Sequence, residues 1–223
     1  MAEMRLFDIL GPVMIGPSSS HTAGAARIGR MTRQLIGEDI VRADVLLTGS
    51  FAATYTGHGT DRAIIGGLMN MNVDDVRLRE SPTLAKKAGV DIVFHTGELA
   101  DAHPNTAQIT ATGVSGQTIC VTAASIGGGR IRVTAIDGLP LSFTGEKNTY
   151  IVWHKDVPGM IALVGTVLAT KAVNIATMNV SRLAQGGQAV MVIEVDAADP
   201  ADNPQALRNL PGVTRAVYLP KLD

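Results

Sequence analysis

Residues 148–196, NTYIVWHKDVPGMIALVGTVLATKAVNIATMNVSRLAQGGQAVMVIEVD, decide the fold of the C-terminal part of the chain. Their apolar spacing alternates between strand and helix patterns, and turn residues separate the segments. The predicted elements are strand 149–154, helix 158–171, strand 174–182, strand 189–196, helix 204–210 and strand 214–219. This βαββαβ order is typical of a ferredoxin-like domain, whose antiparallel sheet has helices on one face and an edge or face free for a second copy.

The residues before 148 predict a second α+β unit, with a mixed sheet and several helices. Helices are predicted over 23–36, 62–69 and 82–88, and strands over 43–47, 90–95, 107–111, 119–124 and 130–136. Gly37 is expected to end the first helix, and Thr60 or Asp61 to cap the second. The pattern weakens over 137–147, which predicts a linker. We therefore expect an α+β chain with domains at 1–147 and 148–223.

Composition excludes several classes of partner. The chain has 223 residues, is 46% hydrophobic, carries 19 basic and 20 acidic side chains, and has a predicted pI near 6.5. This balance attracts neither nucleic acid nor an anionic membrane. No apolar run approaches the roughly 20 residues that span a bilayer. Glu3, Arg5 and Asp8 stand where a secretory signal would be apolar, so we expect a cytoplasmic protein.

Cys120 is the single cysteine of the chain. One thiol can form no internal disulfide and cannot supply the three or four thiolates that an iron–sulfur cluster usually needs. Any such cluster is expected on another chain.

A hydroxyl-rich segment, Ser18-Ser19-Ser20-His21-Thr22, precedes the first predicted helix. Hydroxyls, an imidazole and free backbone N–H groups at the positive end of a helix dipole suit a carboxylate ligand. The alternative is a helix cap with a surface histidine. Spacing alone leaves both interpretations open.

Two further loops carry histidines. In Gly57-His58-Gly59-Thr60-Asp61 the glycines allow a ligand or another chain to approach, and His58 could act as a general base or be an ordinary loop residue. In the second loop, His103 is followed by Pro104, which restricts the backbone, and by Asn105, which offers a donor and an acceptor.

Other chemistries are disfavoured by the motifs. The histidines lack the local spacing of a metal site, so we expect no metal bound by this chain alone. The Gly127-Gly128-Gly129 turn lies between strands and lacks the Lys-Ser/Thr ending of a P-loop. No dinucleotide-binding glycine pattern, nucleophile elbow or Cys-His pair is evident.

In the C-terminal unit, Asp156-Val157-Pro158-Gly159 joins a strand to a helix, and Asn174 opens the next strand. Such a turn combines a cap, a restricted φ and bare glycine backbone. It is either a routine βα turn or part of an amino-acid pocket at a dimer interface.

Taken together, these motifs resemble a known family. The sequence is similar, in order, to the β domain of iron–sulfur L-serine dehydratases at Phe7-Asp8-Ile9, Ile15 to Gly24, Gly57 to Asp61, His103 to Thr106 and Ser125 to Gly129. The C-terminal unit looks like an ACT domain at His154 to Gly159, Val173 to Ala176 and the strand into Asp196.

The resemblance implies deamination of L-serine to pyruvate and ammonia with an α subunit whose cysteines hold a [4Fe–4S] cluster. It implies catalytic roles for His58 and His103, without assigning the proton acceptor, and inactivity of this chain alone. The implied substrate-binding residues are Ser18, Ser19, Ser20, His21, Thr22, Asn105 and Gly127. In the ACT domain, which would dimerise or sense serine, the implied regulatory-ligand residues are Asp156, Gly159 and Asn174.

A second class of function stays open. The β domain is also similar to a substrate-binding domain of some phosphoglycerate dehydrogenases, where its role is allosteric. The same pocket could therefore be a non-catalytic amino-acid sensor, and a homodimeric structural subunit would bind no ligand. Two proton-transfer groups in loops favour the catalytic interpretation.

Overall fold

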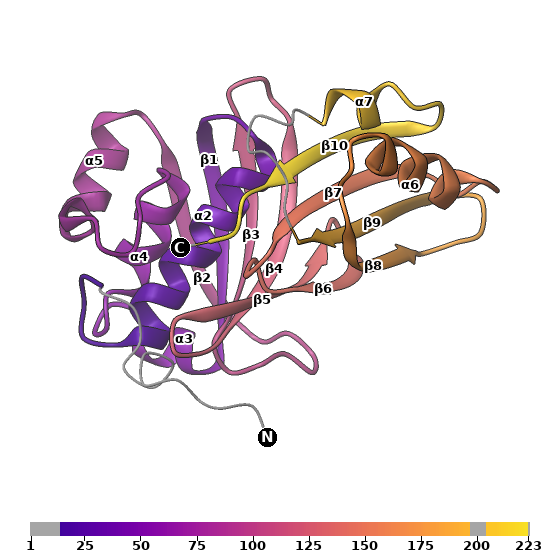
Figure 1. The fold of residues 1–223 in the computed structure, drawn as a ribbon. Coiled ribbons are helices and arrows are strands. Elements are labelled where there is room, and N and C mark those ends of the chain that lie inside the picture. Colours follow the sequence, from indigo (N-terminus) through magenta and orange to yellow (C-terminus); the bar gives the residue numbers. More distant parts are fainter. Residues whose placement is uncertain (1–13, 197–203, 223) are drawn as a thin grey trace. The chain divides into compact units, whose positions relative to one another are not determined.

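A computed structural model of the chain describes residues 14–196 and 204–222 (Figure 1). The chain divides between residues 137 and 138 into two compact units, rather than between 147 and 148. Within the described residues, every helix is too short or too polar to cross a membrane.

The first unit combines helices with a sheet. Its helices are η1 (Ser19–Gly24, a π-helical turn), α2 (Ala25–Ile36), α3 (Gly49–Thr54), α4 (Thr60–Leu68), η2 (Val76–Glu80, a 3₁₀ helix) and α5 (Ser81–Lys87). Its strands are β1 (Ile40–Thr48), β2 (Asp91–Gly97), β3 (Thr106–Gly113), β4 (Thr118–Gly127) and β5 (Arg130–Ile136). All eight predicted elements of this region are present, with ends shifted by a few residues.

The sheet of this unit is mixed, as predicted. Its strands lie in the order β2, β1, β3, β4, β5. β1 is parallel to β2, and the other neighbours are antiparallel, with Leu47 opposite Ala107 and Thr106 opposite Ala124. The end of β1, the start of β3 and the end of β4 therefore lie next to each other at one end of the sheet.

Helices α2 and α4 pack closely because glycines lie at their contact. A β-carbon at Gly29 would overlap the carbonyl oxygen of Ile64, and one at Gly67 would overlap that of Ala26. Side chains at these positions would hold the helices apart. The close approach matters because η1 leads into α2 and the His58 loop leads into α4.

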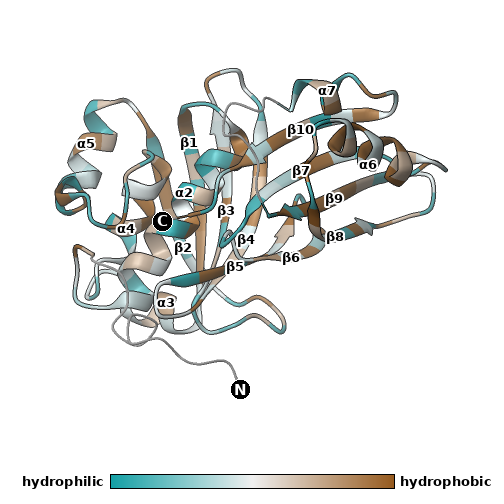
Figure 2. Cartoon of the chain, viewed as in Figure 1, coloured by the Kyte–Doolittle hydropathy of each residue, from teal (hydrophilic) through white to brown (hydrophobic). Residues whose placement is uncertain are grey.

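The second unit has the predicted ferredoxin-like topology. It contains β6 (Leu139–Phe143), β7 (Asn148–Lys155), α6 (Met160–Thr170), β8 (Ile175–Arg182), β9 (Gln188–Val195), α7 (Gln205–Arg208) and β10 (Val213–Leu219). Its antiparallel sheet has the order β10, β7, β9, β8. Val164 and Leu168 of α6 and Leu207 of α7 pack against Tyr150 and Met191 of the sheet. Figure 2 shows the hydrophobic residues along β7 and β9.

The prediction of an irregular linker over 137–147 is wrong for the five residues of β6. Leu139 and Phe143 are buried, whereas Pro140 and Ser142 between them are exposed. This is the alternation of a half-buried strand. Gly138 and Pro140 obscured it, although proline is tolerated in a strand where its missing N–H is not needed.

The expected side-chain cap is present at the first helix but absent at two others. Ser18 caps η1, as expected, by accepting a hydrogen bond from the backbone N–H of His21. Thr60 and Asp61 do not cap α4, and Asp156 does not cap α6. The N-cap residues there are Gly59 and Gly159, with φ of 70° and 89° and no side-chain acceptor. This left-handed conformation favours glycine over a capping side chain.

Candidate functional site

His21 is held by a hydroxyl at each ring nitrogen. Ser18 Oγ lies 3.3 Å from Nδ1, and Ser50 Oγ lies 3.0 Å from Nε2. Ser50 belongs to α3, which follows β1 directly, and the ring of the buried Phe51 packs edge-on against the imidazole at 5.3 Å. The strand, the short helix and the start of η1 thus fix the orientation of this side chain.

A second imidazole lies beside the first. The ring centroids of His21 and His58 are 5.1 Å apart, with an interplanar angle of 67°. Burial, and next the charge of His58, lower the pKa of His21, while a hydrogen bond with the backbone of Ser50 opposes the shift. His21 is therefore neutral over a wider pH range than an exposed histidine, and it can exchange hydrogen bonds with serine hydroxyls or a ligand.

The His103 loop joins this region through Ser50. The backbone N–H of Ser50 donates to the carbonyl of Pro104 at 2.7 Å, and a β-carbon at Gly49 would overlap Pro104. The backbone N–H of Asn105 donates to His103 Nδ1 at 3.1 Å. The loop is thus attached to the end of β1.

Asn105 connects the same loop to the end of β4. The backbone N–H of Ser125 donates to the Asn105 carbonyl at 2.9 Å. The side-chain oxygens Asn105 Oδ1 and Ser125 Oγ are buried and have no hydrogen-bond partner among the described residues. Because buried polar atoms are usually paired, these two atoms are available to a ligand or a water molecule.

The predicted site residues are only partly brought together. Ser18 and His21 contact each other, and His21 contacts His58, whereas Ser19 and Ser20 are half-buried residues of η1. Gly127 lies at the end of β4 with φ of 100°.

The two histidines implied to be catalytic are exposed and line different cavities. His58 lines a pocket of about 520 Å³, and His103 lines one of about 350 Å³ with Gln108 and Thr122. A substrate bound near one imidazole therefore need not touch the other.

The described part of the chain offers no cluster of metal-binding side chains. Among residues 14–196 and 204–222, no group of three or more His, Cys, Asp and Glu side chains could hold a metal ion. Cys120 is half-buried on β4. The residues present do not fit an iron–sulfur cluster.

The proposed regulatory residues lie at two ends of one strand. Asp156 accepts hydrogen bonds from Arg182, at the end of β8, and from the backbone of Gly186. Asn174 precedes β8 and donates to Asp196 at 2.6 Å. Eight strand residues span about 26 Å, so one chain does not bring Asp156 and Asn174 into one pocket.

The Asp156 contacts predict an acid-sensitive turn. Hydrogen bonds from Gly186 and Arg182 lower the pKa of Asp156, so the carboxylate stabilises the fold above its unfolded pKa and loses this contribution as pH falls through its folded pKa. We expect Asp156→Asn to lower the urea midpoint at pH 7 and to lower it less at acid pH, as the wild-type carboxyl takes up a proton. An equal loss at both pH values would contradict this account.

The sequence analysis did not identify Ser50, and it named Ser125 only as part of the Ser125 to Gly129 motif. Ser50 follows a buried strand through Thr48-Gly49, and a polar residue just beyond a strand is a common place for a site residue. Its partner His21 is 29 positions away in sequence, so no local spacing reveals the contact.

Comparisons with known proteins agree with this two-unit architecture. The family model described as "Serine dehydratase beta chain" matches residues 5–89, and "AHAS small subunit-like ACT domain" matches residues 151–215. The chain is 48% identical to the "Probable L-serine dehydratase, beta chain" of Bacillus subtilis, over 88% of this chain and 89% of the relative. It is 34% identical to the "L-serine dehydratase, beta chain" of Peptoniphilus asaccharolyticus, over 98% of this chain and 99% of the relative.

A more distant relative is an enzyme of another name. The D-3-phosphoglycerate dehydrogenase of Synechocystis is 28% identical over 89% of this chain and 36% of its own length. The fold and the family matches define a serine dehydratase-type β domain followed by an ACT domain. The chain belongs to the family of L-serine dehydratase β chains.

Proposed function

We propose that this chain is the β subunit of an iron–sulfur L-serine dehydratase that forms pyruvate and ammonia from L-serine. The observation that carries the proposal is the pair of imidazoles, His21 and His58, 5.1 Å apart in a chain of this family. Serine hydroxyls orient His21, and His58 lines a pocket. The proposed compartment is the cytoplasm.

The proposed reaction is an elimination followed by hydrolysis. A base takes the α-proton, the electron pair of that C–H bond forms the Cα=Cβ bond, and the β-hydroxyl leaves as water after gaining a proton. The resulting 2-aminoacrylate tautomerises to an imine, which water hydrolyses to pyruvate and ammonia. An exposed imidazole such as His58 or His103 suits the proton transfer, since histidine is the side chain that most often acts as a general acid or base in enzymes.

The proposal assigns the [4Fe–4S] cluster to a separate α subunit. Cys120 alone cannot hold a cluster, and the site on this chain offers imidazoles, hydroxyls and guanidinium groups instead. The complete active site would therefore form between two subunits.

The test is anaerobic deamination of L-serine by this chain, by an α subunit, and by their mixture, with pyruvate release as the readout. Activity in the mixture alone supports a shared active site. Activity of the mixture equal to that of the α subunit alone would reduce this chain to a sensor or scaffold.

A non-catalytic serine sensor is the second candidate, and the similarity to a phosphoglycerate dehydrogenase favours it. The two candidates differ in what the histidines do. A sensor predicts that substitution of His58 or His103 alters serine binding. The catalytic proposal predicts that substitution abolishes deamination by the reconstituted pair while binding persists.

We also propose that the ACT domain forms a homodimer. β8 is an edge strand of its sheet, and Val180 on β8 and the following Leu183 are 41% and 71% exposed. On α6, Ile161 and Leu163 are 56% and 42% exposed. An open edge beside exposed apolar side chains favours pairing with a second copy.

Val180→Lys is expected to weaken this dimer, because an inserted charge at a strand edge opposes edge-to-edge pairing. Sedimentation at several concentrations should show an increase of about tenfold or more in the dimer dissociation constant. The matched control is Val114→Lys, since Val114 is 63% exposed and lies in the β3–β4 turn of the first unit. Equal dissociation constants for the two variants would exclude β8 from the interface.

A further inference from the structure

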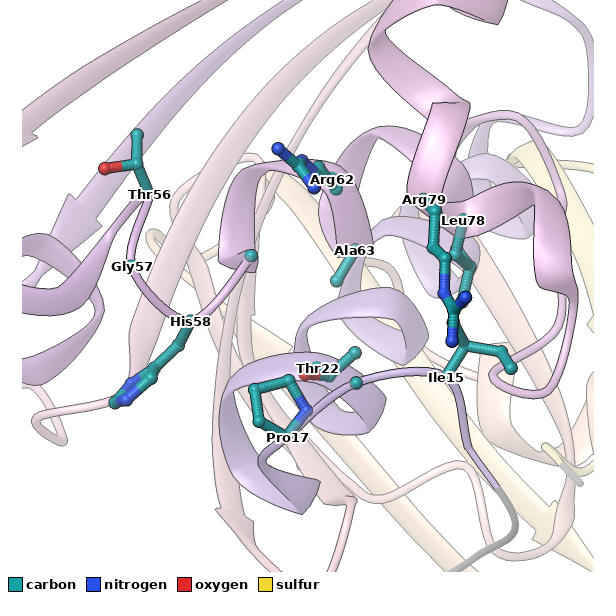
Figure 3. Close-up of a pocket in the computed structure, with 12 residues that line it drawn as sticks. Ile15, Pro17, Thr22, Thr56, Gly57, His58, Arg62, Ala63, Leu78 and Arg79 are labelled. Atoms are coloured by element: carbon teal, nitrogen blue, oxygen red, sulfur yellow. The ribbon is translucent and has the colours of Figure 1, made fainter.

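The pocket beside His58 is cationic. It has a volume of about 520 Å³ and is lined by Ile15, Gly16, Pro17, Thr22, Thr56, Gly57, His58, Gly59, Arg62, Ala63, Leu78 and Arg79 (Figure 3). Two of these side chains are arginines, one is a histidine and none is acidic. A concave surface lined by charge of one sign attracts ligands of the opposite sign.

The two arginines have no counter-ion among the described residues. Neither Arg62 nor Arg79 has a salt bridge or a side-chain hydrogen bond there, and both are exposed. Two other arginines of the same unit are paired, Arg33 with Asp39 and Arg77 with Asp75. The guanidinium groups at the pocket are therefore free to bind an anion.

The position of Arg62 does not stabilise its helix. Arg62 lies in the first turn of α4, where the positive end of the helix dipole disfavours a cation. Gly59, the N-cap, offers no side-chain acceptor to that turn. Asp61 lies in the same turn but does not line the pocket. Burial, and to a smaller extent the charge of Asp61, raise the pKa of Tyr55.

Thr22 supplies an independent observation on another wall. Its side chain lines the pocket and is only 5% exposed, and its Oγ1 has no partner among the described residues. Gly16 packs directly over this side chain, since a β-carbon at Gly16 would overlap it. Figure 3 shows Thr22 and Pro17 on one side of the pocket, with Arg62 and Arg79 drawn around it. A buried hydroxyl without a partner in the protein is available to a polar ligand or a water molecule.

We propose that Arg62 and Arg79 bind the carboxylate of the amino-acid substrate, with the Thr22 hydroxyl as a further donor. This inference rests on the proposed function, because the reaction supplies the carboxylate. Guanidinium groups present paired N–H donors that match a carboxylate. Since His58 lines the same pocket, a substrate bound in this way would share its cavity with that imidazole.

The test compares L-serine with L-serinamide, which lacks the carboxylate, in the reconstituted pair of subunits. Arg62→Gln and Arg79→Gln are each expected to lower kcat/KM for L-serine by roughly 10- to 100-fold, mainly through KM, as charged hydrogen bonds are lost. The value for L-serinamide should change by less than about twofold. Arg62→Lys should recover part of the loss, because lysine keeps the charge but not the paired donors.

The matched control is Arg132→Gln, because Arg132 is exposed on β5 and does not line the pocket. It should leave both substrates unaffected. Equal losses for serine and serinamide in the Arg62 and Arg79 variants would mean that the arginines only maintain the structure, and unchanged KM values would also overturn the proposal.

Calorimetry of L-serine binding to the full chain separates this inference from the proposed function. If the mixture has no deaminase activity, the proposed function fails. Serine binding that weakens about tenfold in the Arg62→Gln and Arg79→Gln chains but not in Arg132→Gln would still support the carboxylate pocket. Equal affinities of the three variants would reject it.

Discussion

Replacing His58 with asparagine is expected to lower kcat for serine deamination by roughly 100- to 10,000-fold, the usual contribution of a general acid or base. Asparagine keeps polarity but cannot exchange a proton near neutral pH. KM should change little, because the arginines rather than His58 are proposed to hold the carboxylate. The measurement is anaerobic pyruvate release by the reconstituted pair of subunits.

His95→Asn is the matched control for this variant. His95 is 58% exposed on β2 and lies 3.9 Å from Asp44, away from the residues that line the pocket. Its substitution should leave kcat within about twofold of the wild type. If the His58 variant also kept its kcat, the imidazole pair would not take part in the chemistry.

Gly67→Val should have the largest effect on folding. The added side chain would collide with the backbone of Ala26 at the contact between α2 and α4. Overpacking of a tight contact costs about 1 to 3 kcal/mol, and the rigid backbone on the other side favours the upper end. Urea unfolding monitored by circular dichroism measures the loss, while unchanged stability would show that the helices separate without strain.

Gly165→Ala is the control for replacing a helical glycine at a position without a close packing contact. Gly165 lies inside α6, and a β-carbon there would meet no heavy atom within 4 Å. Alanine should therefore stabilise that helix by roughly 0.5 to 1 kcal/mol. A loss of stability at Gly67 and a gain at Gly165 would distinguish the effect of helix packing from that of helix propensity.

Much of the fold could be predicted because its signals are local. The continuous apolar runs of β7 and β9 mark two strands of the second sheet, and the Gly186-Gly187 turn separates β9 from β8. Gly37 ended α2 in the predicted place, with φ of 78°. α3 was missed, since only Phe51 is buried among its six residues and one turn and a half shows no periodicity.

The candidate site was less predictable because its contacts are not local. Ser18 and His21 share a segment, but the contact of His21 with Ser50 depends on how β1 positions α3. The unpaired arginines of the pocket come from α4 and η2, and nothing in their spacing distinguishes them from surface charges. The assignments of His58 and His103 as catalytic groups remain predictions.

The meeting of β1, β3 and β4 at one end of the sheet determines when, during synthesis and folding, the site can form. Ser50, Asn105 and Ser125 lie at that end of the sheet, and β1 must pair with β3 across a long connection, whereas β3 and β4 form a hairpin. Pairing across a long connection is a slow step in folding, since the entropy of closing a loop is lost before contacts form. A chain emerging from the ribosome carries both imidazoles early, but its binding surface is completed only once β4 has been synthesised and docked.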